Sequence, residues 1–190
     1  KTKGDNEKVL IITKELGQNI TIPNGENSSY YVNYLISGLA PAYYACAQID
    51  SSLIVLSEAE RLIDTSMLIP NSLKVGLYMN RATIDSEWYH DVISALQNIE
   101  KAKNIMLTII PNENSPAFIE FLNAYSTICV NCNKWEMAID NYKKILSFCQ
   151  SHKEQNGTKN TVYVSALQNI SQCYIQTAEI DKATLYAQEA

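Results

Sequence analysis

The stretch WEMAIDNYKKI, residues 135 to 145, shows most clearly the pattern from which the fold can be predicted. Its side chains Trp135, Ala138, Tyr142 and Ile145 follow one another at spacings of three, four and three residues, which places them on one face of an α-helix. Three segments align with this stretch without gaps and keep its spacing. They are IDSSLIVLSEA from Ile49, YHDVISALQNI from Tyr89 and IDKATLYAQEA from Ile180, so the helix recurs at intervals of 40, 46 and 45 residues.

A second segment with helical spacing precedes each of these four. In LQNISQCYIQTAEI, the residues on one face are Leu167, Ile170, Ser171 and Tyr174. The same offsets hold Leu122, Tyr125, Ser126 and Cys129 in the third unit, Ile36, Leu39, Ala40 and Tyr43 in the first, and Gly76, Met79, Asn80 and Thr83 in the second. Because only two or three residues separate the members of a pair, the two helices must turn back and pack antiparallel.

Proline and glycine separate the pairs, at Pro70, at Pro111 and Pro116, and at Gly157. Pro41 lies inside the first helix, which we expect it to kink or shorten. The predicted helices span residues 30–46, 49–65, 72–87, 89–108, 116–132, 134–152, 160–177 and 179–190.

These residues resemble tetratricopeptide repeats, in which a small residue (here Ala40, Ser126 or Ser171) lies where the helices cross. The resemblance covers residues 30 to 190. It implies an all-α fold, a right-handed superhelical array of about four antiparallel helix hairpins that continues beyond the C-terminus. The usual period is about 34 residues, and the longer units here are similar to stretched variants in bacterial regulators and sensors. Residues 1–29 are expected to form an N-terminal cap or a partly disordered segment.

The cysteines raise the alternative of a zinc site, because Cys129 and Cys132 are followed by Cys149 and His152. If residues 135–149 form a helix, they separate the two pairs by about 20 Å, whereas zinc holds its ligands at about 2.3 Å. The hairpin therefore excludes one tetrahedral site, and we interpret these cysteines as buried apolar residues. We predict no metal and no cofactor.

Composition and charge exclude other classes of function. The chain has 190 residues, a formal net charge of -5 and only two arginines, Arg61 and Arg81, so it lacks the basic stripe that nucleic acid requires. No apolar run approaches the roughly 20 residues that span a bilayer, so membrane insertion by this segment is not expected. No glycine-rich phosphate loop or activated serine is present, and His90 is interpreted as a solvated or capping residue. The sequence therefore predicts that the chain is not an enzyme.

In tetratricopeptide arrays the first helices line a concave groove, and the resemblance implies which residues face it here. The groove would be polar and aromatic, with little charge beyond the second unit. Its predicted residues are Tyr34, Tyr44, Lys74, Tyr78, Arg81, Asn123, Thr127, Asn131, Gln168, Gln172 and Gln176.

The predicted function is binding of a protein or peptide in this groove, as the sensory or scaffolding segment of a larger bacterial signalling protein. The alternative is a repeat-built extracytoplasmic lipoprotein that binds a saccharide or another solute. The chain opens on Lys1 without an initiator methionine and ends within an amphipathic pattern, so we interpret it as part of a longer or processed protein. A periplasmic or membrane-anchored location is favoured over a cytoplasmic one, and the sequence does not specify the oligomeric state.

Overall fold

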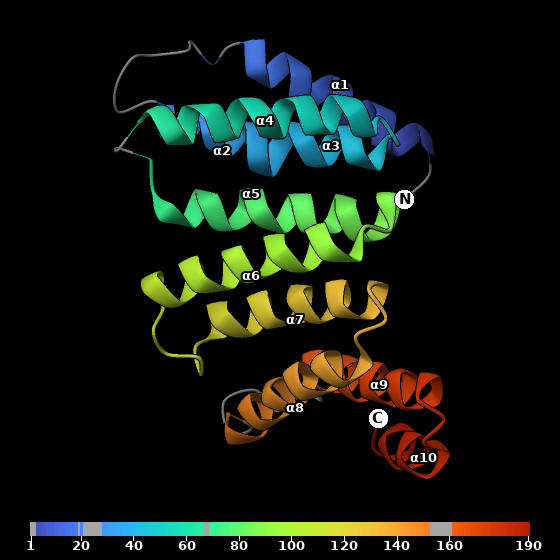
Figure 1. Ribbon diagram of the computed structural model, residues 1–190. Coiled ribbons are helices and arrows are strands. Elements are labelled where there is room, and N and C mark those ends of the chain that lie inside the picture. The colour runs from blue at the N-terminus through green and yellow to red at the C-terminus, as the bar shows by residue number, and fades with distance from the viewer. Residues whose placement is uncertain (1–2, 19, 21–27, 67–68, 153–160) are drawn as a thin grey trace.

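A computed structural model describes residues 3–18, 20, 28–66, 69–152 and 161–190, and all regular structure within them is helical. The helix pairs stack in chain order, with α1 (Lys3–Gln18) at one end of the molecule and α10 (Ile180–Glu189) at the other (Figure 1). Sequential helices pack as antiparallel pairs, so the fold is an all-α helical repeat array. This confirms the fold class that the recurring spacing predicts.

The array begins with a separate helix, α1 (Lys3–Gln18), and continues with four hairpins. The first hairpin joins a long helix in three parts, α2 (Ser28–Asn33), η1 (Tyr34–Leu39) and α3 (Ala40–Ala45), to α4 (Ile49–Thr65). The second joins α5 (Asn71–Ile84) and its extension η2 (Asp85–Tyr89) to α6 (Val92–Ile109). The third and fourth pair α7 (Pro116–Asn131) with α8 (Trp135–Ser151), and α9 (Thr161–Gln176) with α10 (Ile180–Glu189).

One residue with positive φ lies in the turn of every hairpin. Ala47, Asn133 and Ala178 have φ of 58°, 56° and 59°, and each turn carries the same two bonds. In the first, the Ala47 N–H donates to the Tyr44 carbonyl at 2.9 Å and the Gln48 N–H to the Tyr43 carbonyl at 2.9 Å. This is the Schellman arrangement, which satisfies two carbonyls that the end of a helix would otherwise leave unpaired.

The second hairpin has the same turn with one additional residue. His90 holds the left-handed conformation (φ 53°), but the following N–H, of Asp91, reaches back six residues to the Asp85 carbonyl at 2.9 Å instead of five. The wider π-helical turn of η2 accommodates that residue.

The extra residue corrects the predicted register of the second hairpin. Its second helix begins at Val92, not at Tyr89, and Asp91 is its N-cap, accepting from the Ile93 and Ser94 N–H groups at 3.1 Å each. His90 therefore precedes the helix and does not cap it. Counted between the left-handed residues, the units repeat at 43, 43 and 45 residues.

Small residues lie where the two helices of each hairpin cross. The Ser52 hydroxyl of α4 donates to the Ala40 carbonyl at 2.9 Å, and the Ser171 hydroxyl of α9 donates to the Ala183 carbonyl at 2.8 Å. The serine thus lies on the second helix in one unit and on the first in another, and both are buried. The equivalent buried small residue on the first helix of the second unit is Ala82, two residues beyond the predicted Asn80.

Pro41 does not end its helix, because the chain widens into the π-helical segment η1 immediately before it. The Ala40 N–H bonds the Leu35 carbonyl, five residues back. The next carbonyl in that register, Ile36, would accept from residue 41, where proline has no N–H. Asn80 of α5 supplies the missing donor, because its Nδ2 donates to the Ile36 carbonyl oxygen at 2.7 Å. The proline that interrupts the first unit is therefore compensated by a side chain of the second.

The helix α1 packs antiparallel on the long first helix. Asn6 Nδ2 donates to the Ala45 carbonyl at 2.8 Å near one end of α1, and the Tyr34 hydroxyl donates to the Thr13 carbonyl at 3.1 Å near the other. Gly17 lies against the Tyr34 ring, where an added Cβ would collide with the hydroxyl. Of its large apolar residues only Leu10 is buried.

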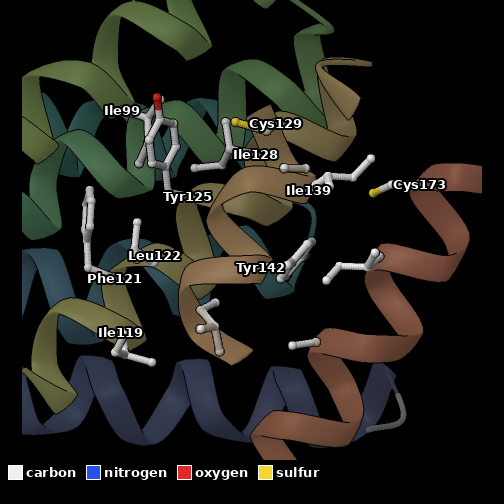
Figure 2. Close-up of a cluster of buried hydrophobic side chains, with 14 of the residues drawn as sticks. Ile99, Ile119, Phe121, Leu122, Tyr125, Ile128, Cys129, Ile139, Tyr142 and Cys173 are labelled. Carbon is white, nitrogen blue, oxygen red and sulfur yellow. The ribbon is translucent and has the colours of Figure 1, made fainter. Parts of the chain in front are cut away.

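The core runs along the array in two clusters of buried side chains that meet at α5, which contributes Leu77 and Ile84 to the first and Val75 and Ala82 to the second. Figure 2 shows the second cluster, in which Tyr125 and Cys129 of α7, Tyr142 of α8 and Cys173 of α9 lie between the helices. The buried Tyr125 finds a partner for its hydroxyl in Glu100 of α6. This bond joins the second hairpin to the third.

Candidate functional site

First helices of successive units meet in the first half of the molecule and separate in the second. The helix α5 contacts η1 on one side and α7 on the other, whereas α9 packs on α8 and α10. A cavity of about 260 Å³ is bounded by residues of α7, α8 and α9. We call this surface the α7–α9 groove, and it is lined by Pro116, Ile119, Glu120, Asn123, Phe148, Cys149 and Val162.

The α7–α9 groove combines apolar walls with polar groups at its edge. Ile119 and Cys149 are buried, Phe148 is half-buried, and Glu120 and Asn123 are exposed. Burial raises the pKa of the Cys149 thiol, so this cysteine behaves as an apolar wall residue. A concave surface with an apolar floor and a few polar groups is the usual form of a binding site for a side chain or a small molecule.

Five of the six predicted groove residues of the third and fourth units lie on exposed surface, and the sixth, Asn131, is half-buried. Asn123, Thr127, Gln168, Gln172 and Gln176 are all exposed on α7 and α9. The Thr127 hydroxyl donates to the Asn123 carbonyl at 3.2 Å. Of the five, the structure brings Asn123 into the cavity itself.

A polar network joins predicted residues of the first and third units. Tyr44, at the end of α3, donates to Glu87, and Asn131, at the end of α7, donates to the same carboxylate at 3.1 Å. Burial and the bond to Glu87 both raise the pKa of the Tyr44 hydroxyl, which keeps it protonated. Glu87 thus connects the turn ends of three consecutive first helices.

Glu87 is not among the predicted groove residues, because the predicted repeat places the start of the second helix of this unit at Tyr89. Counted back from the left-handed residue of each turn, Glu87 is the equivalent of Tyr44 in the first unit and of Val130 in the third. The wider turn of η2 hides this equivalence, since nothing in the composition of residues 85–89 marks an inserted residue. Asn80 and Thr83 likewise lie next to the first unit, where they line a small cavity with Ala40, Pro41 and Tyr44.

The remaining predicted residues lie in the first half of the array, and three of them contact a neighbouring helix. The Tyr34 hydroxyl is bonded beneath α1, and burial raises its pKa. Arg81 forms an ion pair of 2.7 Å with Glu60 of α4, and the Lys101 ammonium of α6 lies 5.3 Å from the centre of the Tyr78 ring. Lys74 is half-buried on α5. None of these side chains lines the α7–α9 groove.

The cysteine pairs lie at opposite ends of the third hairpin, as the helical spacing predicts. Cys129 and Cys132 end α7 beside the turn, whereas Cys149 lies near the end of α8, and His152 stacks on Phe148 with ring centres 4.2 Å apart. Burial raises the pKa of the Cys129 thiol to about 12, so the thiol stays protonated. Among the residues that the structure describes, no group of three or more histidine, cysteine or acidic side chains is placed to hold a metal ion.

Fold and surface together define a class, an all-α helical repeat array with an exposed, amide-bearing first-helix surface. No family model matches the chain, and no curated protein sequence matches it. Among solved structures, it is similar to the crystal structure of BtubC (BKLC) from P. vanneervenii, with a TM-score of 0.66 and 18% sequence identity over 97% of this chain and 68% of that chain. At this identity the likeness concerns the fold alone. Over the described part of the chain, no helix is both long and apolar enough to cross a membrane.

Proposed function

We propose that the chain is a non-enzymatic recognition module that binds an extended peptide, or such a segment of a partner protein, along α7 and α9. The observation that carries this proposal is the cavity of about 260 Å³ in the α7–α9 groove, with Asn123 at its edge. An apolar side chain of the peptide would enter the cavity between Ile119 and Phe148. A volume of this order suits one large side chain rather than a whole ligand, because pockets for small molecules measure about 300–1,000 Å³.

Amide side chains support the choice of a peptide. Asn123, Gln168, Gln172 and Gln176 are exposed, and each primary amide offers both donors and an acceptor, as the peptide bond does. A row of neutral amides can therefore hold a main chain without selecting for charge. The resemblance to tetratricopeptide repeats supports the same proposal, since those repeats bind partners on the face of their first helices. The module would serve as the sensory or scaffolding segment of a larger signalling protein of bacterial type.

Selection from a displayed library of random 12-residue peptides tests the proposal. Peptides selected on the unmodified protein should bind the triple variant Asn123→Ala, Gln168→Ala, Gln172→Ala at least about tenfold more weakly, because each lost hydrogen bond costs about 0.5–1.5 kcal/mol. The matched control, Gln97→Ala with Asn104→Ala, removes two exposed amides of α6. Equal binding of the peptides to all three proteins would contradict the proposal.

The saccharide alternative is supported by one observation, the open aromatic side chains of Trp88 and Tyr89, which are 50% and 49% exposed. Sugars stack on such surfaces, and carboxylates beside them can accept sugar hydroxyls. Titration with neutral oligosaccharides, followed by the fluorescence of Trp88, tests this function directly. Saturable quenching that is lost in the Trp88→Ala variant would favour it over peptide binding.

A further inference from the structure

The turn of the second hairpin exposes more apolar surface than its neighbours. Trp88 and Tyr89 are half-exposed and Ile93 is 70% exposed. Seven residues, DSEWYHD from Asp85 to Asp91, carry these two aromatics together with three carboxylates. We call residues 85–91 with Ile93 the acid-aromatic turn.

The other turns show that the fold does not need aromatic residues there. At the two positions before the left-handed residue, where this turn has Trp88 and Tyr89, the other units have small or polar residues. They are Ala45 and Cys46, Asn131 and Cys132, and Gln176 and Thr177. Exposed tryptophan and tyrosine are the residues most enriched where proteins bind partners.

Charge shows what kind of partner fits. Glu87 accepts from Tyr44 and Asn131, Asp91 from the Ile93 and Ser94 N–H groups, and Asp85 from Asn98 at 2.8 Å. All of these donors are neutral. Lys134, in the next turn, lowers the pKa of the Cys132 thiol, whereas Asp85 and Asp91 raise it. Arg81 acts electrostatically on Asp85, but it is paired with Glu60, and neither cation forms an ion pair with any of the three carboxylates. Within the described residues, therefore, no lysine or arginine neutralises this turn by an ion pair.

We infer that the acid-aromatic turn is a docking surface for a basic peptide segment, with an arginine or lysine side chain held over Trp88 or Tyr89 and near Glu87 and Asp91. A cation above an aromatic ring is attracted by the negative face of the ring, and the carboxylates, which form no ion pair, add attraction that salt screens. This surface lies outside the α7–α9 groove and shares none of its lining residues. It is thus a second site, independent of the proposed function.

Fluorescence anisotropy of labelled hexa-arginine at low ionic strength tests this inference on the unmodified chain. Two double variants should each weaken binding at least about tenfold. The first double variant, Trp88→Ala with Tyr89→Ala, removes both aromatic rings. The second, Glu87→Gln with Asp91→Asn, removes two negative charges, and the asparagine at position 91 can still cap α6. Raising the salt should weaken binding to the unmodified protein, and labelled hexa-glutamate should not bind.

The control for general attraction to an acidic protein is Glu136→Gln with Asp140→Asn, which removes two charges from exposed positions of α8. It should change the affinity less than about twofold, and the triple amide variant of α7 and α9 should bind hexa-arginine normally. Equal weakening in this control, unchanged binding after loss of both rings, or displacement of hexa-arginine by a neutral oligosaccharide would each overturn the inference. Normal hexa-arginine binding together with failure of the library selection would reject the proposed function alone.

Discussion

Four residues without glycine's conformational freedom hold the left-handed conformation in the turns, namely Ala47, His90, Asn133 and Ala178. This conformation costs a residue with a Cβ roughly 1–2 kcal/mol, and asparagine tolerates it better than most. Glycine would relieve that cost, but it would also increase the entropy of the unfolded chain. The alanine turns therefore retain strain that a single substitution can remove.

Replacing Ala47 or Ala178 by glycine should raise the free energy of unfolding by about 0.5–1 kcal/mol each, since relief of the left-handed alanine outweighs the added unfolded-state entropy. Urea unfolding followed by circular dichroism measures the change. Ala45→Gly, at the end of α3, is the control and should destabilise by up to about 1 kcal/mol. Destabilisation by Ala47→Gly would show that the turn does not have the described conformation.

Pro41 and Asn80 form a second residue-scale pair, because the asparagine donates to a carbonyl that the proline leaves without a helical partner. Asn80→Ala should cost about 1–3 kcal/mol, the penalty for an unsatisfied acceptor away from water. In the Pro41→Ala variant, the N–H of residue 41 can donate to the Ile36 carbonyl in place of Asn80. Asn80→Ala should therefore destabilise this variant by at least about 0.5 kcal/mol less than it destabilises the unmodified protein. Unfolding free energies of the four proteins measure this coupling, and strictly additive effects would refute it.

Elements were predictable wherever the apolar spacing is regular. The helix at 49–65 has the predicted bounds, and the third hairpin agrees with prediction to within a residue at each end. The second unit was not predictable in register, because a π-helical turn adds a residue without any mark in the sequence. Most of α1 escaped prediction for a different reason. Its apolar residues Val9, Ile12 and Leu16 are exposed. Their spacing therefore does not mark the face of α1 that packs on the first hairpin.

Attachment of α1 depends on close contact between Gly17 and Tyr34. Gly17→Ala should separate the end of α1 from η1, because the added Cβ meets the rigid tyrosine ring. Hydrogen exchange of the α1 amides should accelerate while that of α7 to α9 stays unchanged. Gly4→Ala, where an added Cβ meets nothing within 4 Å, should instead leave exchange equal or slower. Identical exchange in both variants would mean that α1 does not pack as described.

At the scale of the whole molecule, the array follows from four hairpins of one design. The recurring small residues and the spacing of the second helices were sufficient to predict that design. The candidate site was predictable only in part. Asn123 reaches the cavity, but the apolar walls come from Phe148 and Ile119, whose sequence positions read as ordinary core. These two residues line a cavity because α7 and α9 lie apart at this point. The separation of the two helices depends on how whole units pack, so no local sequence pattern predicts it.

The helices that follow α1 form four hairpins, and one left-handed residue lies in the turn of each. Backbone NMR assignment, with secondary shifts and φ-dependent three-bond couplings, tests this arrangement most directly. We expect helical shifts on both sides of each turn and positive φ at Ala47, His90, Asn133 and Ala178. Extended shifts within residues 116–151, or an unbroken helix through His90 into α6, would contradict it.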